Sequence, residues 1–228
     1  MPNVTGVIGI SSPESSRYAL FYSNLTRVEK PPHTALAHVT GPCVPDSRNK
    51  IADQALGAGA EWIWFVDDDH IFPVDTLTRL LAHNVSVVSG LYLQRCSPYK
   101  PQMYDREDTD GALFHRPILQ GDSGLKPVLA TGAGCLLVRT AVLKQLEPPY
   151  WQFARTPEGN TVGEDIDFCR KVREKGFTIW CDMDVRVGHY TTGLVYPTRD
   201  EEGNWGTIFI EPGGTPVFTA PPAAPELS

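Results

Sequence analysis

The sequence predicts a single-domain α/β fold in which helices flank a wound sheet. Short apolar runs alternate with helix-like stretches along the N-terminal two thirds of the chain, as they do in βα-wound sheets. The 228 residues suffice for one core that buries roughly 70% of the surface of the unfolded chain. Apolar residues make up 41% of the chain and charged residues 21%, which is typical of an ordered globular protein.

The first half of the chain is expected to alternate strands with helices. The strands are expected at residues 4–10, 34–39, 61–66 and 85–93. The helices are expected at residues 14–25, 48–56 and 73–83. Asp46 or Ser47 is the expected N-cap of the second helix, and Pro73 is expected to open the third.

The second half of the chain has a less regular pattern. We expect loops with a short hairpin at residues 97–125. A strand is expected at 127–138, interrupted by Gly132-Ala133-Gly134, and a short helix at 140–146. A helix at 165–175 begins with acids and ends with bases, which suits its dipole, and late strands follow at 177–181 and 185–187. We therefore expect one domain over residues 1–210 and a proline-rich, flexible tail over 211–228, extended or disordered past about Phe218.

The composition excludes several classes of protein. A net charge of −7 argues against nonspecific binding of nucleic acid or of acidic membranes, because both need a basic surface. The sequence contains no apolar run near the roughly 18–20 residues that span a bilayer, and its first residues do not resemble a signal peptide. The five cysteines form neither a CxxC pattern nor the framework of a secreted protein. We therefore expect a reduced, cytoplasmic protein without a transmembrane segment.

The strongest chemical signal is the apolar run WIWFV, which leads directly into Asp67, Asp68 and Asp69. Ligands of open α/β sheets bind beyond the carboxyl ends of the strands. Adjacent carboxylates repel one another, and a cation relieves that repulsion. Asp67 and Asp69, two residues apart, can both turn toward one Mg²⁺ or Mn²⁺ ion. The alternative is a solvated turn, since aspartate favours turns in any case.

Two further features point to the same chemistry. Glu164 and Asp165 open a helix, where acids are also common as simple caps. His189 follows the last apolar segment, and a neutral imidazole can complete a ligand set that begins with carboxylates. A lone histidine is nevertheless more often structural.

Taken together, these segments resemble the GT-A fold of nucleotide-sugar-dependent glycosyltransferases, with a pattern like that of family 2. WIWFVDDDHIFP resembles the strand and DxD motif of that fold, and GEDIDFCRKVREKGF resembles its acceptor-side ED helix. VGH resembles the C-terminal metal-binding histidine, and SRNKIADQALGAGAEW the helix before the DxD strand. The resemblance covers about residues 4–192 and implies a mixed, mainly parallel, Rossmann-like sheet flanked by helices.

The resemblance also implies roles for individual residues. Asp67, Asp69 and His189 would hold Mn²⁺ or Mg²⁺, which would bridge the diphosphate of a donor, with a UDP-sugar as the first expectation. Asp68 would face the ribose. Asp165 would be the general base that deprotonates an acceptor hydroxyl, a role that predicts inversion at the anomeric carbon, and Glu164 would orient the acceptor or support the base.

Other residues are candidates for donor and sugar contacts. Arg48 and Asn49 lie in the first turn of their helix and can face a phosphate, although a solvated helix start is the alternative. Ser11 and Glu14 follow the first strand at the nucleotide-facing crevice.

Gly132, Ala133 and Gly134 lack the third glycine of a dinucleotide fingerprint, so we expect an open backbone that a sugar can approach. Trp151, with the aromatic side chains beside it, is expected to form a wall on which a sugar stacks. A place in the core is the alternative for these aromatics.

Other classes of protein share parts of the pattern. A HAD-type phosphatase also has a strand that ends in DxD, but its strand lies much nearer the N-terminus. A GT-A-like nucleotidyltransferase would carry a glycine-rich Lys/Arg signature where this chain has VIGISSPESSR. A non-catalytic, metal-dependent nucleotide- or sugar-binding module also remains. We expect a metal-dependent glycosyltransferase (hexosyl- or pentosyltransferase), with the acceptor left open.

Overall fold

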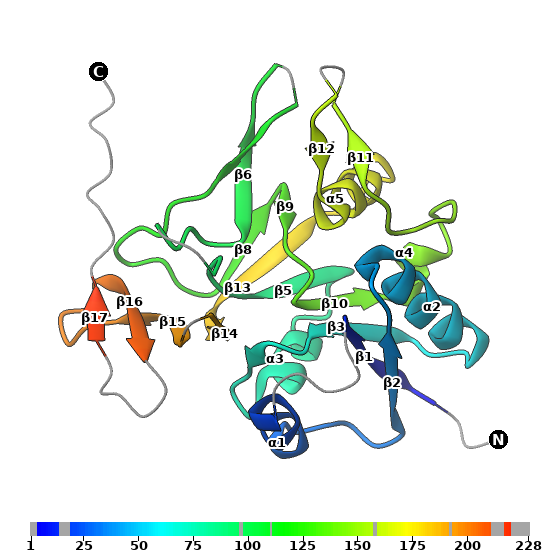
Figure 1. Cartoon of the computed structure of the whole chain (residues 1–228), viewed down its shortest axis with the longest axis horizontal. Coiled ribbons are helices and arrows are strands. Elements are labelled where there is room, and N and C mark those ends of the chain that lie inside the picture. The colour runs from blue at the N-terminus through cyan, green and yellow to red at the C-terminus, as the bar shows by residue number, and fades with distance from the viewer. Residues whose placement is uncertain are drawn as a thin grey trace.

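A computed structural model describes residues 4–13, 19–95, 98–109, 111–156, 159–191, 193–210 and 217–219. Its centre is a seven-stranded sheet with the order β2-β1-β3-β10-β5-β13-β8 (Figure 1). These strands are β1 (Gly6–Ser12), β2 (Thr34–Thr40), β3 (Trp62–Asp67), β5 (Val87–Leu91), β8 (Leu125–Val128), β10 (Cys135–Arg139) and β13 (Ile179–Arg186).

The central sheet is mixed and mainly parallel, as the sequence predicts. β2, β1, β3, β5 and β13 run in one direction, while β10 and β8 run in the other. β3 lies inside the sheet, between β1 and β10, and is buried on both faces, which explains its continuous apolar sequence. Ile63 and Phe65 point into one core and Trp64 and Val66 into the other, as the alternation of a strand requires.

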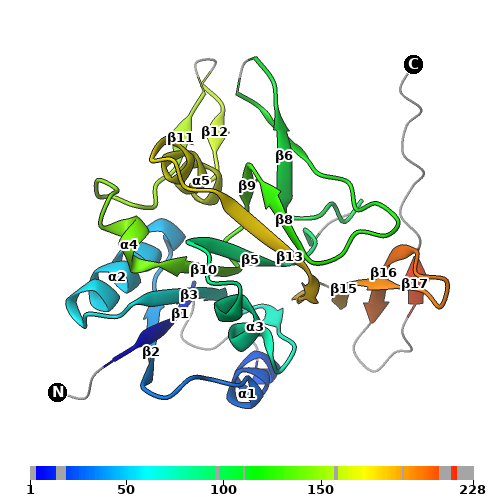
Figure 2. The same cartoon turned by 180° about the vertical axis from the view of Figure 1, so that it is seen from behind.

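Helices cover both faces of this sheet, so the chain has two apolar layers. The helices are α1 (Ala19–Arg27), α2 (Val44–Gly57), α3 (Thr76–Ala82), α4 (Thr140–Leu143) and α5 (Glu164–Glu174). Apolar residues of α2, α4 and α5 belong to one core cluster, and those of α1 and α3 belong to the other. Both views show this division, with α1 and α3 together on one side of the sheet (Figures 1 and 2).

Three smaller sheets extend the central one. The largest has the order β17-β16-β15-β14-β4, the second β7-β6-β9, and the third is the hairpin β11-β12. Their strands are β4 (His70–Ile71), β6 (Met103–Glu107), β7 (Leu113–His115), β9 (Ala130–Thr131), β11 (Ala154–Arg155), β12 (Thr161–Val162), β14 (Gly188–Tyr190), β15 (Leu194–Arg199), β16 (Trp205–Ile210) and β17 (Val217–Thr219). β6 and β7 confirm the expected short hairpin. The sequence analysis did not predict the five-stranded sheet.

Several expected boundaries are wrong. α2 begins at Val44, with Pro45 in its first turn and Cys43 as its N-cap, so neither Asp46 nor Ser47 caps it. The ring of Pro45 fixes the helical φ angle of the first turn, and its missing N–H group is one that the helix leaves unpaired in any case. α3 begins only at Thr76. Most of the expected tail lies outside the described residues, but Val217–Thr219 pairs with β16. Within the described part of the chain, no helix is both long enough and apolar enough to cross a membrane.

The packing of β1 generates a stability prediction. A Cβ atom at Gly6 would lie 1.9 Å from Cε2 of the buried Trp62, so Gly6→Ala forces the indole to move. We expect the free energy of unfolding to fall by roughly 1–3 kcal/mol or more, measured by urea denaturation. Gly57→Ala is the control, because a Cβ atom there meets open space and should change stability by less than about 1 kcal/mol. Equal stability of the two variants would contradict this packing.

Candidate functional site

The acidic end of β3 lies where several elements meet. Asp67 is in register with Ser11 at the end of β1, and its backbone N–H donates to the carbonyl of Gly134 at 3.2 Å. The segment that joins β9 to β10 therefore reaches the same edge of the sheet as the ends of β1 and β3. This edge is the carboxyl edge at which α/β proteins bind ligands.

Arg48 connects this edge to the ED helix. Its guanidinium, in a side chain that is 3% exposed, donates to Asp67 Oδ1 at 2.7 Å and to Glu164 Oε1. It also lies over the ring of Trp151, 5.3 Å from the ring centroid. Burial acts to lower the pKa of Arg48, but Asp67, Glu164 and Asp165 outweigh it and raise the pKa. Arg48 is therefore a buried cation that joins α2, β3 and α5.

Asp165 has the properties of a general base. Burial raises its pKa to about 6, and the neighbouring Glu164 charge adds to the rise, while Arg48 and the Ile166 N–H act against it. That N–H donates to Oδ1 at 2.8 Å, which holds the side chain at the start of α5. Oδ2 lies 3.5 Å from where a Cβ atom of Gly132 would be. A base with a pKa of about 6 is ionised at neutral pH and still able to accept a proton.

A second cluster combines one carboxylate with two imidazoles. Each of Asp69, His70 and His189 offers a ligand atom within 4.8 Å of the others. Asp69 Oδ1 lies 3.1 Å from His70 Nδ1, and Oδ2 lies 3.5 Å from His189 Nε2. The two rings stack with their centroids 4.2 Å apart. Burial acts to raise the pKa of Asp69, but His189 and His70 outweigh it and hold the pKa well below the usual range.

The chemistry of this cluster fits a divalent cation. His189 Nδ1 lies 2.7 Å from the Leu93 carbonyl, so it carries the proton and leaves Nε2 as a potential ligand. Burial lowers the pKa of His70, and His189 lowers it further, so His70 is neutral. Its Nδ1 atom faces the Asp69 carboxylate at 3.1 Å, whereas its Nε2 atom is buried without a hydrogen bond from the described residues and is a potential ligand atom. Arg95, whose side chain is 48% exposed, donates to Asp69 Oδ2 at 3.0 Å.

The structure places the expected metal ligands in two groups. Asp69 and His189 lie in the cluster, whereas Asp67 binds Arg48. His70 was missed in the sequence, although it directly follows the three aspartates. Asp68 is 2% exposed and Ser11 5% exposed, so their proposed donor contacts stay predictions. Glu14 lies outside the described residues.

The glycine-rich segment gives room to the protein's own side chains. A Cβ atom at Gly132 would lie 2.0 Å from the hydroxyl of Tyr92, and one at Gly134 would lie 2.5 Å from His70 Cε1. The Tyr92 hydroxyl also accepts a hydrogen bond from the Gly134 N–H at 3.1 Å. Ala133 between them is buried. The approach of a sugar to this backbone therefore stays a prediction.

Two expected contact residues have structural roles instead. Trp151 is 1% exposed and stacks on Phe168 with ring centroids 4.0 Å apart, so it belongs to the core rather than to a sugar-stacking wall. Asn49 donates to the Trp151 carbonyl at 2.8 Å and accepts from its N–H at 3.0 Å. The side-chain amide of Asn49 therefore binds the Trp151 backbone, whereas the sequence analysis expected it to contact the sugar donor. Local sequence does not reveal the contact between Asn49 and Trp151, because 102 residues separate them.

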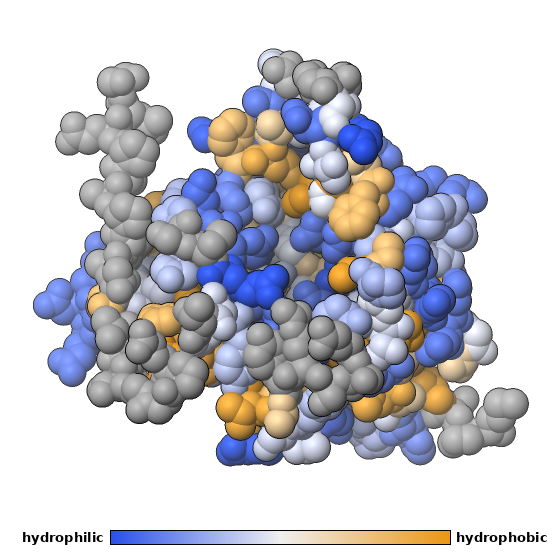
Figure 3. Space-filling view, in the orientation of Figure 1, coloured by the Kyte–Doolittle hydropathy of each residue, from blue (hydrophilic) through white to orange (hydrophobic). Residues whose placement is uncertain are grey.

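The site opens onto one face of the molecule. In the space-filling view, apolar surface flanks a hollow in the middle of this face, over the region where β9 leads into β10 (Figure 3). Phe153, at 57% exposed, is a large apolar side chain available to a ligand near the β11-β12 hairpin.

Comparisons with known proteins bear on the family and the fold of the chain. The sequence model of the family described as "Glycosyltransferase like family 2" matches residues 26–203. The crystal structure of A197 from STIV matches with a TM-score of 0.60 and 14% identity over 99% of both chains. S. aureus TarS 1–349 in complex with UDP matches with a TM-score of 0.47 and 15% identity, over 79% of this chain and 57% of that chain. A search of curated proteins finds no match.

The buried position of Arg48 generates a second prediction. Arg48→Gln leaves Asp67 and Glu164 without their shared cation, so we expect the free energy of unfolding to fall by roughly 2–4 kcal/mol. Urea denaturation measures this loss. Arg27→Gln removes the same charge from an exposed position on α1 and should leave stability within about 0.5 kcal/mol of the wild type. An Arg48 variant as stable as the Arg27 variant would show that the bridge contributes little.

Proposed function

We propose that this chain, which belongs to glycosyltransferase-like family 2, transfers a sugar from a nucleoside-diphosphate sugar to an acceptor hydroxyl with inversion. The family establishes a glycosyltransferase with a GT-A fold. The observation that carries the mechanism is the position of Asp165, with a pKa raised to about 6, beside the Arg48 bridge to the acidic end of β3. Donor and acceptor chemistry would meet at this edge of the sheet.

Asp165 acts as the base in this proposal. It accepts the proton of the acceptor hydroxyl, whose oxygen attacks the anomeric carbon while the bond from that carbon to the diphosphate breaks. The electron pair of that bond leaves with the nucleoside diphosphate, so one displacement inverts the anomeric carbon. Glu164 is held by Arg48 and orients the acceptor rather than accepting the proton. The hydrogen bond from Ile166 N–H keeps Asp165 in one orientation.

A divalent cation would be held by Asp69 and His189, with Asp67 as the third expected ligand and His70 as an additional candidate. When bound, the cation stabilises the negative charge that grows on the departing diphosphate. Carboxylate and imidazole ligands together suit Mn²⁺ better than Mg²⁺, which prefers oxygen ligands and water. A cation also resolves the electrostatic problem of an acidic protein that binds a diphosphate.

The donor is proposed to be a UDP-sugar with a hexosyl or pentosyl group. Ser11 and Asp68 are proposed to face its nucleoside, because Ser11 is in register with Asp67 at the end of β1 and Asp68 follows Asp67 directly. The backbone of Gly132, Ala133 and Gly134, close to Asp165, is proposed to face the sugar and acceptor.

The metal proposal has a direct test that needs no substrate. Calorimetry should show that Mn²⁺ binds the wild type, and that Asp69→Asn and His189→Ala each weaken binding by at least about tenfold. Asp53→Asn is the matched control, because Asp53 is exposed on α2 and belongs neither to the Asp69-His70-His189 cluster nor to the Arg48 bridge. Unchanged Mn²⁺ affinity in both site variants would overturn the proposed ligands. Full transfer activity in excess chelator would overturn metal dependence itself.

The base proposal predicts a pH profile. Below a pKa of about 6 the Asp165 carboxyl is protonated and cannot accept a proton, so turnover should fall about tenfold per pH unit as the pH decreases, and level off above it. Asp165→Asn should reduce turnover roughly 10²–10⁴-fold and leave donor affinity unchanged. Glu174→Gln, at the exposed end of the same helix, is the control. A binding module would show no turnover at any pH, and a flat profile would exclude Asp165 as the base.

A further inference from the structure

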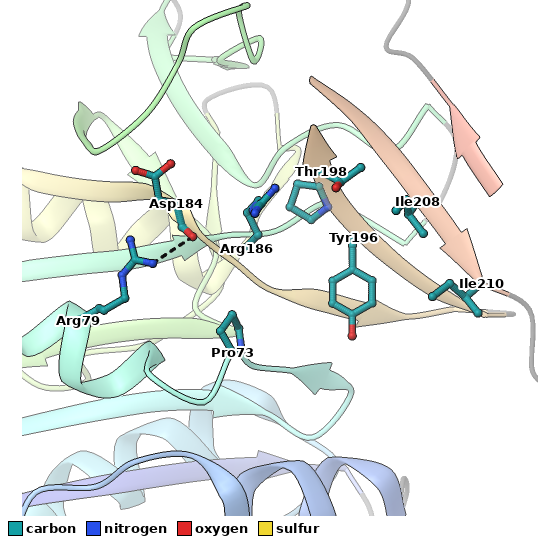
Figure 4. Close-up of a pocket in the computed structure, with 9 residues that line it drawn as sticks. Pro73, Arg79, Asp184, Arg186, Tyr196, Thr198, Ile208 and Ile210 are labelled. Atoms are coloured by element: carbon teal, nitrogen blue, oxygen red, sulfur yellow. Dashed lines mark hydrogen bonds between the residues drawn. The ribbon is translucent and has the colours of Figure 1, made fainter. Parts of the chain in front are cut away.

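A second cavity lies on the side of the molecule that carries the five-stranded sheet. It has a volume of about 440 Å³ and lies between β15 and β16 on one side and α3 and β13 on the other (Figure 4). Pockets for small molecules in proteins span roughly 300–1,000 Å³. None of the residues proposed for the donor, the cation or the base lines this cavity.

One side of this cavity carries two arginines, Arg79 and Arg186, of which Arg79 also lies 3.9 Å from the Asp75 carboxylate. Arg79 donates to the Asp184 carbonyl at 3.5 Å and lies 3.6 Å from the buried carboxylate of Asp182. The Asp184 carboxylate accepts a hydrogen bond from the Gly124 N–H at 2.7 Å and therefore has a partner outside the cavity. Arg186 is half-buried, and its side chain makes neither a hydrogen bond nor an ion pair with any of the described residues. The charge of Arg186 is thus available to a ligand.

The opposite side of the cavity is apolar. Ile208 and Ile210 of β16 lie across from the two arginines, with the ring of Tyr196 between them (Figure 4). Tyr196 is held in place, because its ring packs against Gly188, where a Cβ atom would lie 2.6 Å from Cε1. Thr198, on the same strand as Tyr196, adds a hydroxyl near Arg186. The lining therefore has one end with two arginines, of which Arg186 is unpaired among the described residues, and one apolar end.

We propose that this cavity binds a small phosphate monoester that carries an apolar group. The phosphate would lie against Arg186, Arg79 and Thr198, and the apolar group against Ile208, Ile210 and Tyr196. A phosphate monoester has three terminal oxygens and a charge of roughly −1.5 to −2, which matches two guanidinium groups and a hydroxyl better than a carboxylate does. In a protein of net charge −7, the unpaired guanidinium makes this cavity a local exception.

The test measures binding of octyl phosphate to the full chain by calorimetry, at concentrations at which the probe is monomeric. Inorganic phosphate lacks the apolar chain and octyl glucoside lacks the phosphate, so each should bind at least about tenfold more weakly than octyl phosphate. Arg186→Gln should weaken octyl phosphate binding at least about tenfold, whereas Arg186→Lys should retain part of it. Arg27→Gln removes one exposed charge elsewhere and should bind as the wild type does.

A second variant tests the apolar end. Ile208→Glu replaces apolar contact with a negative charge and should also weaken binding by at least about tenfold. Thermal melting shows which variants fold, and binding is compared among those only. The proposal is overturned if the wild type does not bind octyl phosphate, or if neither Arg186→Gln nor Ile208→Glu changes its affinity. Equal affinity for inorganic phosphate or for octyl glucoside would overturn it as well.

Discussion

One buried cation holds the site together. Arg48 lies between Asp67 at the end of β3 and Glu164 at the start of α5, two carboxylates that the chain separates by almost a hundred residues. A guanidinium keeps its charge under all ordinary conditions, so its burial requires such partners. Trp151 packs beneath it, and Asn49 from the next position of α2 holds the Trp151 backbone. The end of β3 and the start of α5 are therefore linked by the protein's own side chains.

The proposed base and the proposed cation ligands occupy different environments, which separates their protonation states. Burial and a neighbouring carboxylate raise the pKa of Asp165 to about 6. Asp69 is also buried, but two imidazoles face it, so its pKa is lowered instead. The same residue type therefore supplies a proton acceptor at one position and a permanent anion at the other. Gly132 and Gly134 permit this arrangement, because side chains there would collide with Tyr92 and His70.

The five-stranded sheet links two parts of the molecule with different chemistry. β14 carries His189 toward the proposed cation site, and β15 beside it carries Tyr196 and Thr198 into the second cavity. Gly188 lies at the contact, since the ring of Tyr196 takes the space that a side chain there would need. The late segments thus do more than extend the fold. They place His189 beside Asp69 and His70, and they form one side of the second cavity.

The sequence by itself determined the α/β class, because β3 is apolar at every position and short apolar runs alternate with amphipathic helices. It also proposed Asp67, Asp69, Asp165 and His189 as site residues, since they stand at the ends of apolar segments or in the first turn of a helix. Only the tertiary structure decided the places of Trp151, Asn49 and His70. An aromatic side chain can pack in the core or stack on a sugar. A side-chain amide can hydrogen-bond to a sugar donor or to the protein backbone. Contacts between segments that are distant in the sequence decide between these roles. Local sequence patterns do not reveal such contacts, because packing depends on which surfaces the whole fold brings together.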